Sequence, residues 1–398
     1  MKTLNSALNG FHRNVKKIET RPDIMPEDDA VIFFTSGTTG LPKGVLSTQR
    51  QYLTNTMNTI VARRRALLRK GEEIPVPSID DPQQGFLISV PLFHVTGTTS
   101  MTMSATFIGA KIVFLRKWHP QEAARLIRQE NLTNAGGVPS MSADLIESEL
   151  AGYEGLDGLS FGGATTAAVL TQRAVKAFPN ATITQGYGMT ECNSIATSVA
   201  GDDWHARPTT AGYPSPITDI AVVKDSKVVP TGDLGEIWIK GCNVMKGYWR
   251  DQAATDRTIT KDGWLMTGDI GFQDSDGFVY VRDRIKDIII RGGENIDSTT
   301  VENALFIDGV TEVAAVAVPD KRLGELVAAV VVAKPEANLT EESLLAVARA
   351  RLPAFAVPVM ILFRKEMEHN PAGKIMKPPL RRLAAAEWVK KKANRAKL

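Results

Sequence analysis

The sequence has few cysteines, no long apolar run and almost no net charge, and each of these shortages argues against a class of function. Its 398 residues include only two cysteines, Cys192 and Cys242. Two cysteines cannot form a disulfide framework, and their separation matches no metal-binding spacing, so a reducing compartment is expected. No apolar stretch reaches the length that crosses a membrane, and the polar residues 1–17 lack the apolar core of a secretory signal. The formal net charge of +3 is too small to indicate a nucleic-acid partner or a membrane surface.

The composition that remains is that of an ordinary globular protein. The hydrophobic fraction is 43% and the charged fraction is 23%, both of which are typical of globular domains. A chain of this length can bury two or more sizeable cores. No internal repeat is evident.

One stretch near the amino terminus combines glycines, hydroxyls and a lysine. The apolar run Ala30–Phe34 is expected to form a strand buried on both faces, and the loop Thr35–Gly44 follows it. Glycines let backbone N–H groups approach an anion, hydroxyls add donors, and a lysine adds positive charge. The loop therefore predicts a polyphosphate site, although its spacing is not that of the common P-loop and a polar turn is the plainer alternative. The predicted phosphate-binding residues are Thr35, Ser36, Gly37, Thr38, Thr39, Gly40 and Lys43.

A second motif, Gln185–Glu191, combines an aromatic ring, a hydroxyl and a carboxylate. Tyr187 can stack on a purine and Thr190 can donate a hydrogen bond to a phosphate. Glu191 can bind Mg2+, which prefers one or two carboxylates together with phosphate oxygens. A simple corner between a strand and a helix is the alternative. Because the motif occurs together with the first loop, a nucleotide site is favoured. Cys192, which follows directly, is expected to be a packing residue.

Two single residues also stand where ligands bind. His94 follows the apolar strand Gly85–Val90, at a strand end of the kind that forms ligand sites in α/β folds, although a lone histidine is more often structural. Asp269 lies between two glycines and can accept hydrogen bonds from two ribose hydroxyls; an Asp-Gly turn is the alternative. The charged run Asp283–Asp287 can be a solvated domain boundary.

Taken together, these motifs resemble the adenylate-forming superfamily, which includes acyl-CoA synthetases, aryl-CoA ligases, luciferases and the adenylation domains of peptide synthetases. The resemblance extends from about Asp29 to about Pro378. It implies an α/β fold with a large N-terminal domain of layered sheets and helices plus a β-rich subdomain, residues 1–285. A small, mobile α+β C-terminal domain, residues 286–398, follows a hinge at Lys286. The family carries a longer segment ahead of the phosphate loop than is present here.

The resemblance also implies roles for individual residues. Lys374 is expected to enter the active site and contact the carboxylate and the α-phosphate, and His94 to lie between the acyl and CoA sites. The implied catalytic residues are Lys374, Thr190, Glu191 and His94, with Glu191 also holding the metal. The remaining implied binding positions, for nucleotide, acyl group, hinge and pantetheine tunnel, are Gly163, Ala164, Gln185, Gly186, Tyr187, Gly188, Asp269, Arg284, Lys286, Gly292 and Gly293.

The function that the sequence predicts is an ATP-dependent acyl-CoA ligase that uses ATP, Mg2+ and coenzyme A. Its substrate is a carboxylic acid, with a fatty acid favoured, and the products are an acyl-CoA thioester, AMP and pyrophosphate. The alternatives are an aryl-CoA ligase, a luciferase-like enzyme, or a non-catalytic nucleotide or acyl binder, which the short amino-terminal region makes possible.

Two expectations concern the whole molecule. A shortened large domain should leave apolar surface uncovered, which favours a homodimer or poor solubility. The final residues Ala396-Lys397-Leu398 resemble a peroxisomal address. A peroxisomal location is therefore expected if the source is eukaryotic, and a cytoplasmic one otherwise.

Overall fold

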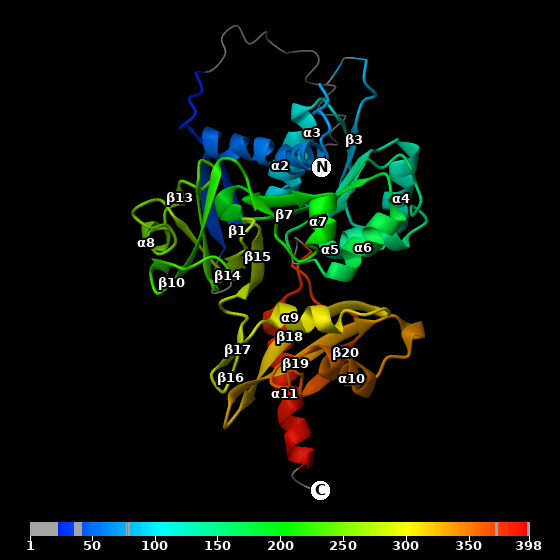
Figure 1. The fold of residues 1–398 in the computed structure, drawn as a ribbon, viewed down its shortest axis with the longest axis vertical. Helices are drawn as coiled ribbons and strands as arrows, with labels where there is room; N and C mark the ends of the chain where they lie inside the picture. Colours follow the sequence, from blue (N-terminus) through cyan, green and yellow to red (C-terminus); the bar gives the residue numbers. More distant parts are fainter. Residues whose placement is uncertain are drawn as a thin grey trace, which may run out of the picture.

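The computed structural model describes residues 23–35, 42–76, 78, 80–164, 166–370 and 373–395. Figure 1 shows a large upper body, in blue to yellow-green, above a smaller body in yellow to red. The chain passes from the first body to the second after residue 284, where the last strand of the upper part ends.

A mostly parallel sheet forms the centre of the large body. Within the described residues it has seven strands in the order β4-β3-β5-β6-β7-β8-β9. The pairs from β4 to β7 are parallel, and β8 and β9 are antiparallel additions at one edge. The strands are β3 (Gly85–Ile88), β4 (Lys111–Phe114), β5 (Asn134–Gly137), β6 (Gly158–Gly162), β7 (Thr182–Tyr187), β8 (Thr197–Ala200) and β9 (Tyr213–Pro214).

Helices pack along this sheet because one face of each is apolar. In α4, for example, Ala123, Ala124 and Ile127 share one face and are fully buried, as expected for residues spaced three and four apart. They join a core with Leu159 and Ile183 of the sheet. The helical segments of the large body are α2 (Gln49–Arg69), the π-helix η1 (Thr96–Thr102), α3 (Met103–Phe107), α4 (Pro120–Gln129), α5 (Pro139–Glu147), α6 (Ala168–Ala177), the short 3₁₀ segment η2 (Thr190–Cys192), α7 (Asp202–Ala206) and α8 (Gln252–Asp256).

Two smaller antiparallel sheets complete the large body. One has the order β1-β2-β13 and the other has the order β11-β10-β12-β14-β15. The strands are β1 (Asp29–Thr35), β2 (Lys43–Thr48), β13 (Gly247–Tyr248), β10 (Thr218–Lys224), β11 (Lys227–Val228), β12 (Gly235–Gly241), β14 (Leu265–Gln273) and β15 (Val279–Arg284).

The first strand corrects one expectation. We expected Ala30–Phe34 to be buried on both faces, but β1 pairs antiparallel with β2 at the edge of its sheet. Phe33 is buried, whereas 65% of Phe34 is exposed. The expectation was wrong because an apolar run does not distinguish a central parallel strand from an edge strand that has one uncovered face.

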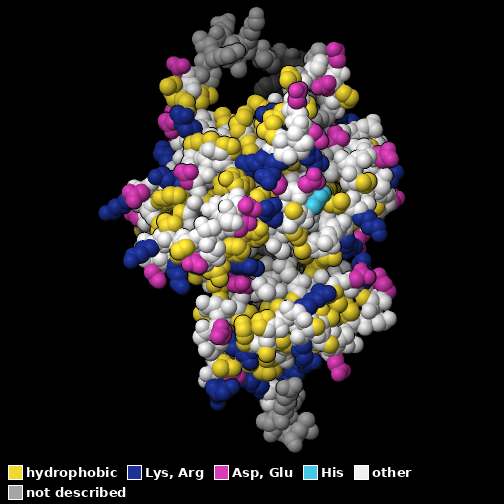
Figure 2. Space-filling model, in the orientation of Figure 1, with side chains coloured by type: hydrophobic (Ala, Val, Ile, Leu, Met, Phe, Trp, Pro, Cys, Tyr) yellow, Lys and Arg dark blue, Asp and Glu magenta, His cyan; other side chains and the backbone are white. Residues whose placement is uncertain are grey.

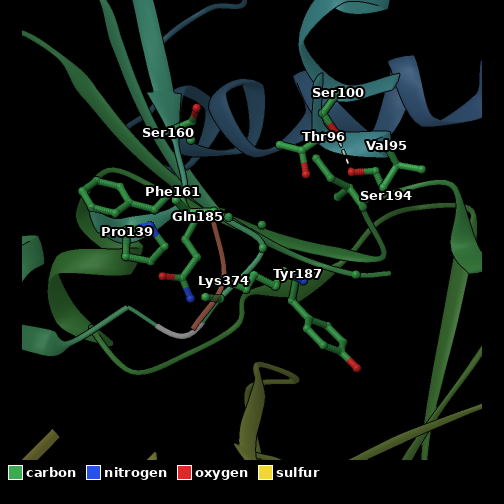
Figure 3. A pocket seen from close by; sticks show the side chains of 18 of the residues that line it. Val95, Thr96, Ser100, Pro139, Ser160, Phe161, Gln185, Tyr187, Ser194 and Lys374 are labelled. Atoms are coloured by element: carbon green, nitrogen blue, oxygen red, sulfur yellow. Dashed lines mark hydrogen bonds between the residues drawn. The ribbon is translucent and has the colours of Figure 1, made fainter. Parts of the chain in front are cut away.

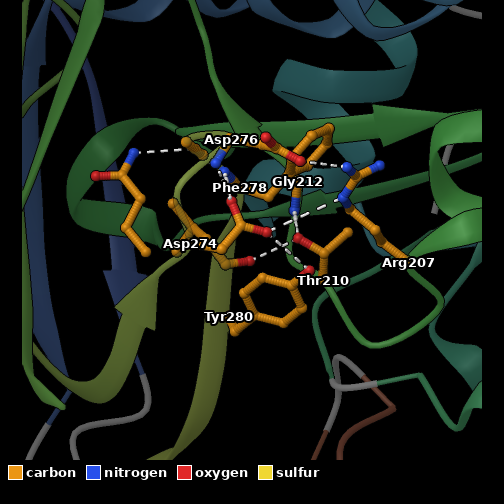
Figure 4. A network of polar contacts seen from close by, with 10 residues as sticks. Arg207, Thr210, Gly212, Asp274, Asp276, Phe278 and Tyr280 are labelled. Atoms are coloured by element: carbon orange, nitrogen blue, oxygen red, sulfur yellow. Dashed lines mark hydrogen bonds and ion pairs between the residues drawn. The ribbon is translucent and has the colours of Figure 1, made fainter. Parts of the chain in front are cut away.

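A polar network joins the five-stranded sheet to the edge of the central sheet (Figure 4). Arg207, just after α7, donates to Asp276 in the turn between β14 and β15 and stacks on the Phe278 ring. The Thr210 hydroxyl donates to the Val279 carbonyl at 2.7 Å. Because the Gln185 side chain of β7 donates to the Thr210 carbonyl, Thr210 connects β7 to β15.

The small body is an α+β unit built on one sheet. Strands β17 (Glu294–Ile296), β16 (Ile289–Arg291), β19 (Gly324–Ala333) and β18 (Val310–Asp320) pair in that order, and β20 (Met360–Arg364) pairs parallel with β19. Alternate residues of β18 and β19 enter two cores, one on each face, which explains why both strands are apolar almost throughout. The helical segments are α9 (Ser298–Leu305), η3 (Pro335–Ala337), α10 (Glu341–Arg351) and α11 (Lys377–Arg395).

No helix in the described part of the chain is both long enough and apolar enough to span a membrane.

Candidate functional site

A cavity of about 2500 Å³ opens where the large body meets the small one. Its walls come from the loops after β3, β6 and β7, from β14 and β15, and from the segment before α11. Figure 2 shows the molecular surface hollowed between the two bodies, and Figure 3 shows side chains that line the cavity. The carboxyl ends of parallel strands meet at this edge of the sheet, which is where ligands bind in open α/β sheets.

Asp269 and Arg284 form a charged pair that closes one side of the cavity. Asp269 is buried in β14 and lies 3.2 Å from Nε of Arg284, measured at its Oδ1 atom. The Tyr187 hydroxyl donates to Oδ2 of Asp269 at 2.8 Å. Burial raises the pKa of Asp269, while Arg284 and the Tyr187 hydroxyl oppose that rise. A carboxylate fixed by these two partners keeps lone pairs free to accept further hydroxyls.

Lys374 reaches this pair from the small body. Its backbone N–H donates to the side-chain oxygen of Asn370 at 3.0 Å, which fixes the turn that carries it. Its side chain lies against the turn after β6. Cε of Lys374 is 3.5 Å from the position that a Cβ on Gly163 would occupy. Desolvation in the cavity, aided by the positive charge of Arg284, lowers the pKa of Lys374 to about 8. Lys374, which the resemblance placed in the active site, lines the cavity.

Glu191 lies in η2 and is buried. The Tyr248 hydroxyl donates to its Oε1 atom at 2.7 Å, and the Lys43 ammonium lies 4.7 Å from the centroid of the same tyrosine ring. Burial and the Glu191 charge together raise the pKa of Tyr248, so the phenol stays protonated and keeps donating. The Gly-Tyr-Trp sequence around Tyr248 gives no sign that its hydroxyl meets a carboxylate.

His94 follows β3 and lies in the cavity wall. The Thr96 backbone N–H donates to Nδ1 of His94 at 3.2 Å, so Nδ1 is the acceptor and the ring proton is on Nε2. Burial, with a further contribution from the Lys374 charge, lowers the pKa of His94 to about 4. The imidazole is therefore neutral at pH 7 and can donate one hydrogen bond from Nε2.

The glycines of the Gln185–Glu191 motif permit a very tight loop. A Cβ at Gly188 would lie 1.6 Å from the Ser194 carbonyl oxygen, so no larger residue can stand there. Gln185 donates to the Thr210 carbonyl at 3.0 Å, and its side chain is drawn in the cavity in Figure 3. The other predicted residues of this region that line the cavity are Gly163, Ala164, Gly186, Tyr187 and Thr190.

The remaining predicted residues fall into three groups. Thr35 and Lys43 line the cavity, and between them the loop residues Ser36, Gly37, Thr38, Thr39 and Gly40 lie outside the described residues. Lys286 also lines the cavity, and burial together with Arg284 lowers its pKa. Gly292 and Gly293 form the exposed turn between β16 and β17, with φ values of 59° and 93°, and they are not among the cavity residues.

Sequence comparison identifies relatives over nearly the whole chain. A model of the AMP-binding enzyme family matches residues 3–249, and a model of the C-terminal domain of AMP-binding enzymes matches residues 300–374. The chain is 35% identical to a long-chain-fatty-acid–CoA ligase of Bacillus subtilis, over 90% of this chain and 62% of the relative. It is 33% identical to a feruloyl-CoA synthase of Amycolatopsis, over 89% of this chain and 70% of the relative. The chain therefore spans roughly two thirds of the length of these relatives.

Solved structures that resemble this chain agree with the family match. ATP-bound MatB from Rhodopseudomonas palustris superimposes with a TM-score of 0.78 at 29% identity, covering 91% of this chain and 69% of that one. The o-succinylbenzoate CoA synthetase of Bacillus subtilis, in complex with its acyl-adenylate intermediate, gives a TM-score of 0.76 at 27% identity, covering 90% and 70%. The large body with its small C-terminal partner is thus the fold of adenylate-forming enzymes.

Proposed function

The chain belongs to the family of AMP-binding enzymes, and from that premise we propose that it is an AMP-forming acyl-CoA ligase. It would activate a carboxylic acid with ATP and pass the acyl group to coenzyme A. Relatives that carry the names of long-chain fatty acid and feruloyl-CoA enzymes support this class of reaction.

The observation that carries the proposal is the meeting of four charged side chains in one cavity. Lys374 comes from the small body, whereas Asp269, Arg284 and Glu191 come from three separate segments of the large one. All four residues line the same cavity, and the charges of the other three act on the pKa of Lys374. A structural role does not require a lysine to be desolvated beside a second cation, whereas an anionic substrate would stabilise both cations.

In the first step a carboxylate oxygen attacks the α-phosphorus of ATP. A bond forms between these two atoms, and the bond from the α-phosphorus to the bridging oxygen breaks as pyrophosphate leaves. Lys374 would hold the attacking carboxylate and neutralise charge on the α-phosphoryl group, and Thr190 and Lys43 would contact phosphate oxygens. Asp269 would accept the ribose hydroxyls, and Tyr187 would lie against the adenine.

The residues present suit a magnesium ion that is bound together with ATP. Among the described residues no group of three or more potential ligands gathers in one place, which argues against a metal held by protein alone. Glu191 is one buried carboxylate held by the Tyr248 hydroxyl, and Mg2+ typically takes one or two carboxylates along with phosphate oxygens. Bound there, the ion would supply positive charge at the phosphates.

In the second step the CoA thiolate attacks the acyl carbonyl carbon, and the bond from that carbon to the AMP oxygen breaks. We propose that the large domain ends at residue 285 and that the small domain, 286–398, turns about Lys286 between the steps. This motion would replace Lys374 by the Gly292–Gly293 turn, which would then line the pantetheine channel. His94, with its neutral ring, would lie between the acyl and CoA sites.

The test is a pyrophosphate exchange assay with a panel of fatty and aromatic acids, followed by detection of the thioester after CoA is added. Exchange that depends on the acid, together with thioester formation, is the expected result. Acid-dependent exchange without thioester would instead favour an adenylating enzyme with another acceptor; one similar structure is the amide bond synthetase McbA from Marinactinospora thermotolerans. ATP binding without any exchange would favour a non-catalytic binder.

We also propose a homodimer, on the basis of exposed apolar side chains around the cavity mouth. Phe34, Phe93 and Phe107 are 65%, 63% and 58% exposed, and all three line the cavity. Sedimentation of a monodisperse monomer that binds no hydrophobic dye would exclude this proposal.

The proposed location is the peroxisome if the source is eukaryotic. The sequence Ala396-Lys397-Leu398 that supports it lies outside the described residues. A fluorescent protein carrying the last residues of the chain should gather in peroxisomes, and diffuse fluorescence would contradict the proposal.

A further inference from the structure

Two serine hydroxyls meet on one wall of the cavity, away from the charged residues. Ser100 belongs to η1 and Ser194 follows η2, and their Oγ atoms lie 2.7 Å apart. Both residues line the cavity and are 9% exposed. Figure 3 shows the pair joined by a dashed line, beside Thr96 and on the far side of the cavity from Gln185 and Lys374.

The pair has one more hydroxyl proton than the protein uses. A hydroxyl donates one hydrogen bond and can accept two. The two serines share a single bond, and Ser100 also accepts a long contact of 3.5 Å from the Asn55 amide. Among the described residues neither hydroxyl has an acceptor other than its partner, so whichever serine donates, the other keeps a proton. Its acceptor must come from the cavity.

The backbone at Ser194 is held in a conformation that a residue with a side chain rarely adopts. Its φ is 109°, directly after Asn193 at 57°. Glycine adopts such angles without cost, whereas a serine here is strained, and strain of this kind gathers at ligand sites. The surroundings enforce it, because the Asn193 amide donates to the Ser47 hydroxyl at 2.9 Å and to the Asn243 carbonyl at 3.0 Å.

The long helix α2 fixes the next residue from the other side. The Asn55 side-chain oxygen accepts from the Ile195 N–H at 2.8 Å, and the Asn58 amide donates to the Ile195 carbonyl at 3.0 Å. Buried asparagines in the middle of a helix are otherwise unfavourable. Here they clamp the loop that carries Ser194, so the hydroxyl position is preorganised before any ligand arrives.

We propose that the acid activated by this enzyme carries an oxygen on its acyl group, a hydroxyl or an oxo group, that accepts a hydrogen bond from the Ser100–Ser194 pair. The inference rests on the proposed ligase function and narrows its substrate class. An unsubstituted hydrocarbon chain would leave the spare hydroxyl proton unpaired in a desolvated pocket. Sites that hydrogen-bond a substrate oxygen discriminate strongly against the analogue that lacks it.

The experiment compares matched acids in the pyrophosphate exchange assay with the full chain. Each pair is an unsubstituted acid and its oxygenated derivative: octanoic acid with its hydroxy and oxo derivatives, and cinnamic acid with its para-hydroxy derivative. We expect at least one oxygenated acid to have a kcat/KM roughly 10-fold or more above its parent. The double variant Ser100→Ala with Ser194→Gly should lower this ratio by about 10-fold, because either serine left alone still has a proton to donate. Ser194→Gly removes the hydroxyl and relieves the backbone strain at the same time, so it should fold.

A matched control is Thr106→Ala, which removes an exposed hydroxyl from α3 that bonds to the Thr102 carbonyl outside the cavity. It should leave the ratio unchanged. If the kcat/KM of every parent acid equals or exceeds that of its oxygenated derivatives, the substrate assignment is overturned while the ligase function stands. A preference for oxygenated acids that survives in the double serine variant would overturn the role of the pair. Absence of exchange with every acid would overturn the ligase function, and the substrate assignment with it.

Discussion

Lys374 is the residue on which the proposed chemistry depends most, since it is a cation placed beside another cation in a partly buried site. Its tasks, orienting the carboxylate and stabilising the α-phosphoryl charge, exist only before the acyl-adenylate forms. Lys374→Ala should therefore slow pyrophosphate exchange by roughly 10²–10³. Conversion of a synthetic acyl-adenylate to thioester should change little. Lys365, which is exposed on the same domain, supplies the control Lys365→Ala. Normal exchange in Lys374→Ala would mean that Lys374 is an ordinary surface lysine.

The pKa of Lys374 gives the same residue a pH signature. The side chain is charged below its pKa of about 8 and loses its proton above it. Because kcat/KM reports the free enzyme, kcat/KM of the first step should fall as pH rises through about 8. In Lys374→Arg, which stays charged, this fall should move to higher pH even if the rate is low. His94, with a pKa lowered to about 4, remains neutral over the same range and should not contribute. An unchanged profile in Lys374→Arg would assign the titration to another group.

A role for Tyr248 in holding Glu191 can be tested by substitution, although the sequence did not suggest it. Its hydroxyl is the donor that holds Glu191, and hydrogen bonds to charged groups are among the stronger ones. Tyr248→Phe should reduce pyrophosphate exchange by about 10-fold and raise the Mg2+ concentration needed for half-maximal rate. Tyr153→Phe, a ring outside the cavity, is the matched control. A magnesium dependence equal to that of the wild type would mean that Tyr248 only packs.

Among the elements, the connection between β15 and β16 carries the proposed hinge. The last strand of the large body ends at Arg284 and the next begins at Ile289. No hydrogen bond of the Lys286 N–H is found among the described residues, so Lys286→Pro removes no donor that the structure uses, while it fixes φ. The substitution should trap one orientation and affect the two half-reactions unequally. Lys286→Ala separates loss of the side chain from loss of rotation, and equal loss of both steps in the proline variant would remove the hinge assignment.

In the molecule as a whole, one ion pair joins the two bodies. Lys334 of the small body lies 2.6 Å from Glu147 of α5, which also receives Arg173 of α6. Among the described residues it is the only ion pair between residues 23–285 and the rest. Although burial acts to raise the pKa of Glu147, hydrogen bonds from Lys334 and Arg173 lower it. The carboxylate is therefore charged at neutral pH.

This pair should favour the orientation that keeps Lys374 in the cavity. Glu147→Gln should lower pyrophosphate exchange by about 2-fold to 5-fold, the range of a partly exposed ion pair, without slowing thioester formation from the acyl-adenylate. Added salt should reduce the difference between variant and wild type, because screening weakens the pair in the wild type alone. Glu149→Gln is a control on the same loop region, since Glu149 forms no ion pair among the described residues. Equal slowing of both steps would indicate general destabilisation instead.

The local chemistry and some of the elements could be predicted from residues that lie close together in the chain. The apolar run Gly85–Val90 was enough to predict a strand, which is present as β3 (Gly85–Ile88). The chemistry of the motifs indicated Asp269 and Glu191, and the family resemblance indicated Arg284; all three line the cavity. Cys192, expected to be a packing residue, is fully buried, and burial raises its pKa to about 12. Such features depend on residues near one another in the chain, where side-chain spacing carries the information.

The packed fold alone gives the features that depend on contacts between distant segments. It set the exposure of Phe34 on an edge strand, and it brought the Tyr248 hydroxyl to Glu191 and Ser100 to Ser194, pairs that are 57 and 94 residues apart. Neither partner in such a pair carries a local signal for the other, since a hydroxyl in a turn has the same sequence pattern whether it meets water or a carboxylate. Burial then shifts the pKa values of these side chains and decides whether each donor finds an acceptor. Desolvation acts on a side chain only after the chain has packed around it.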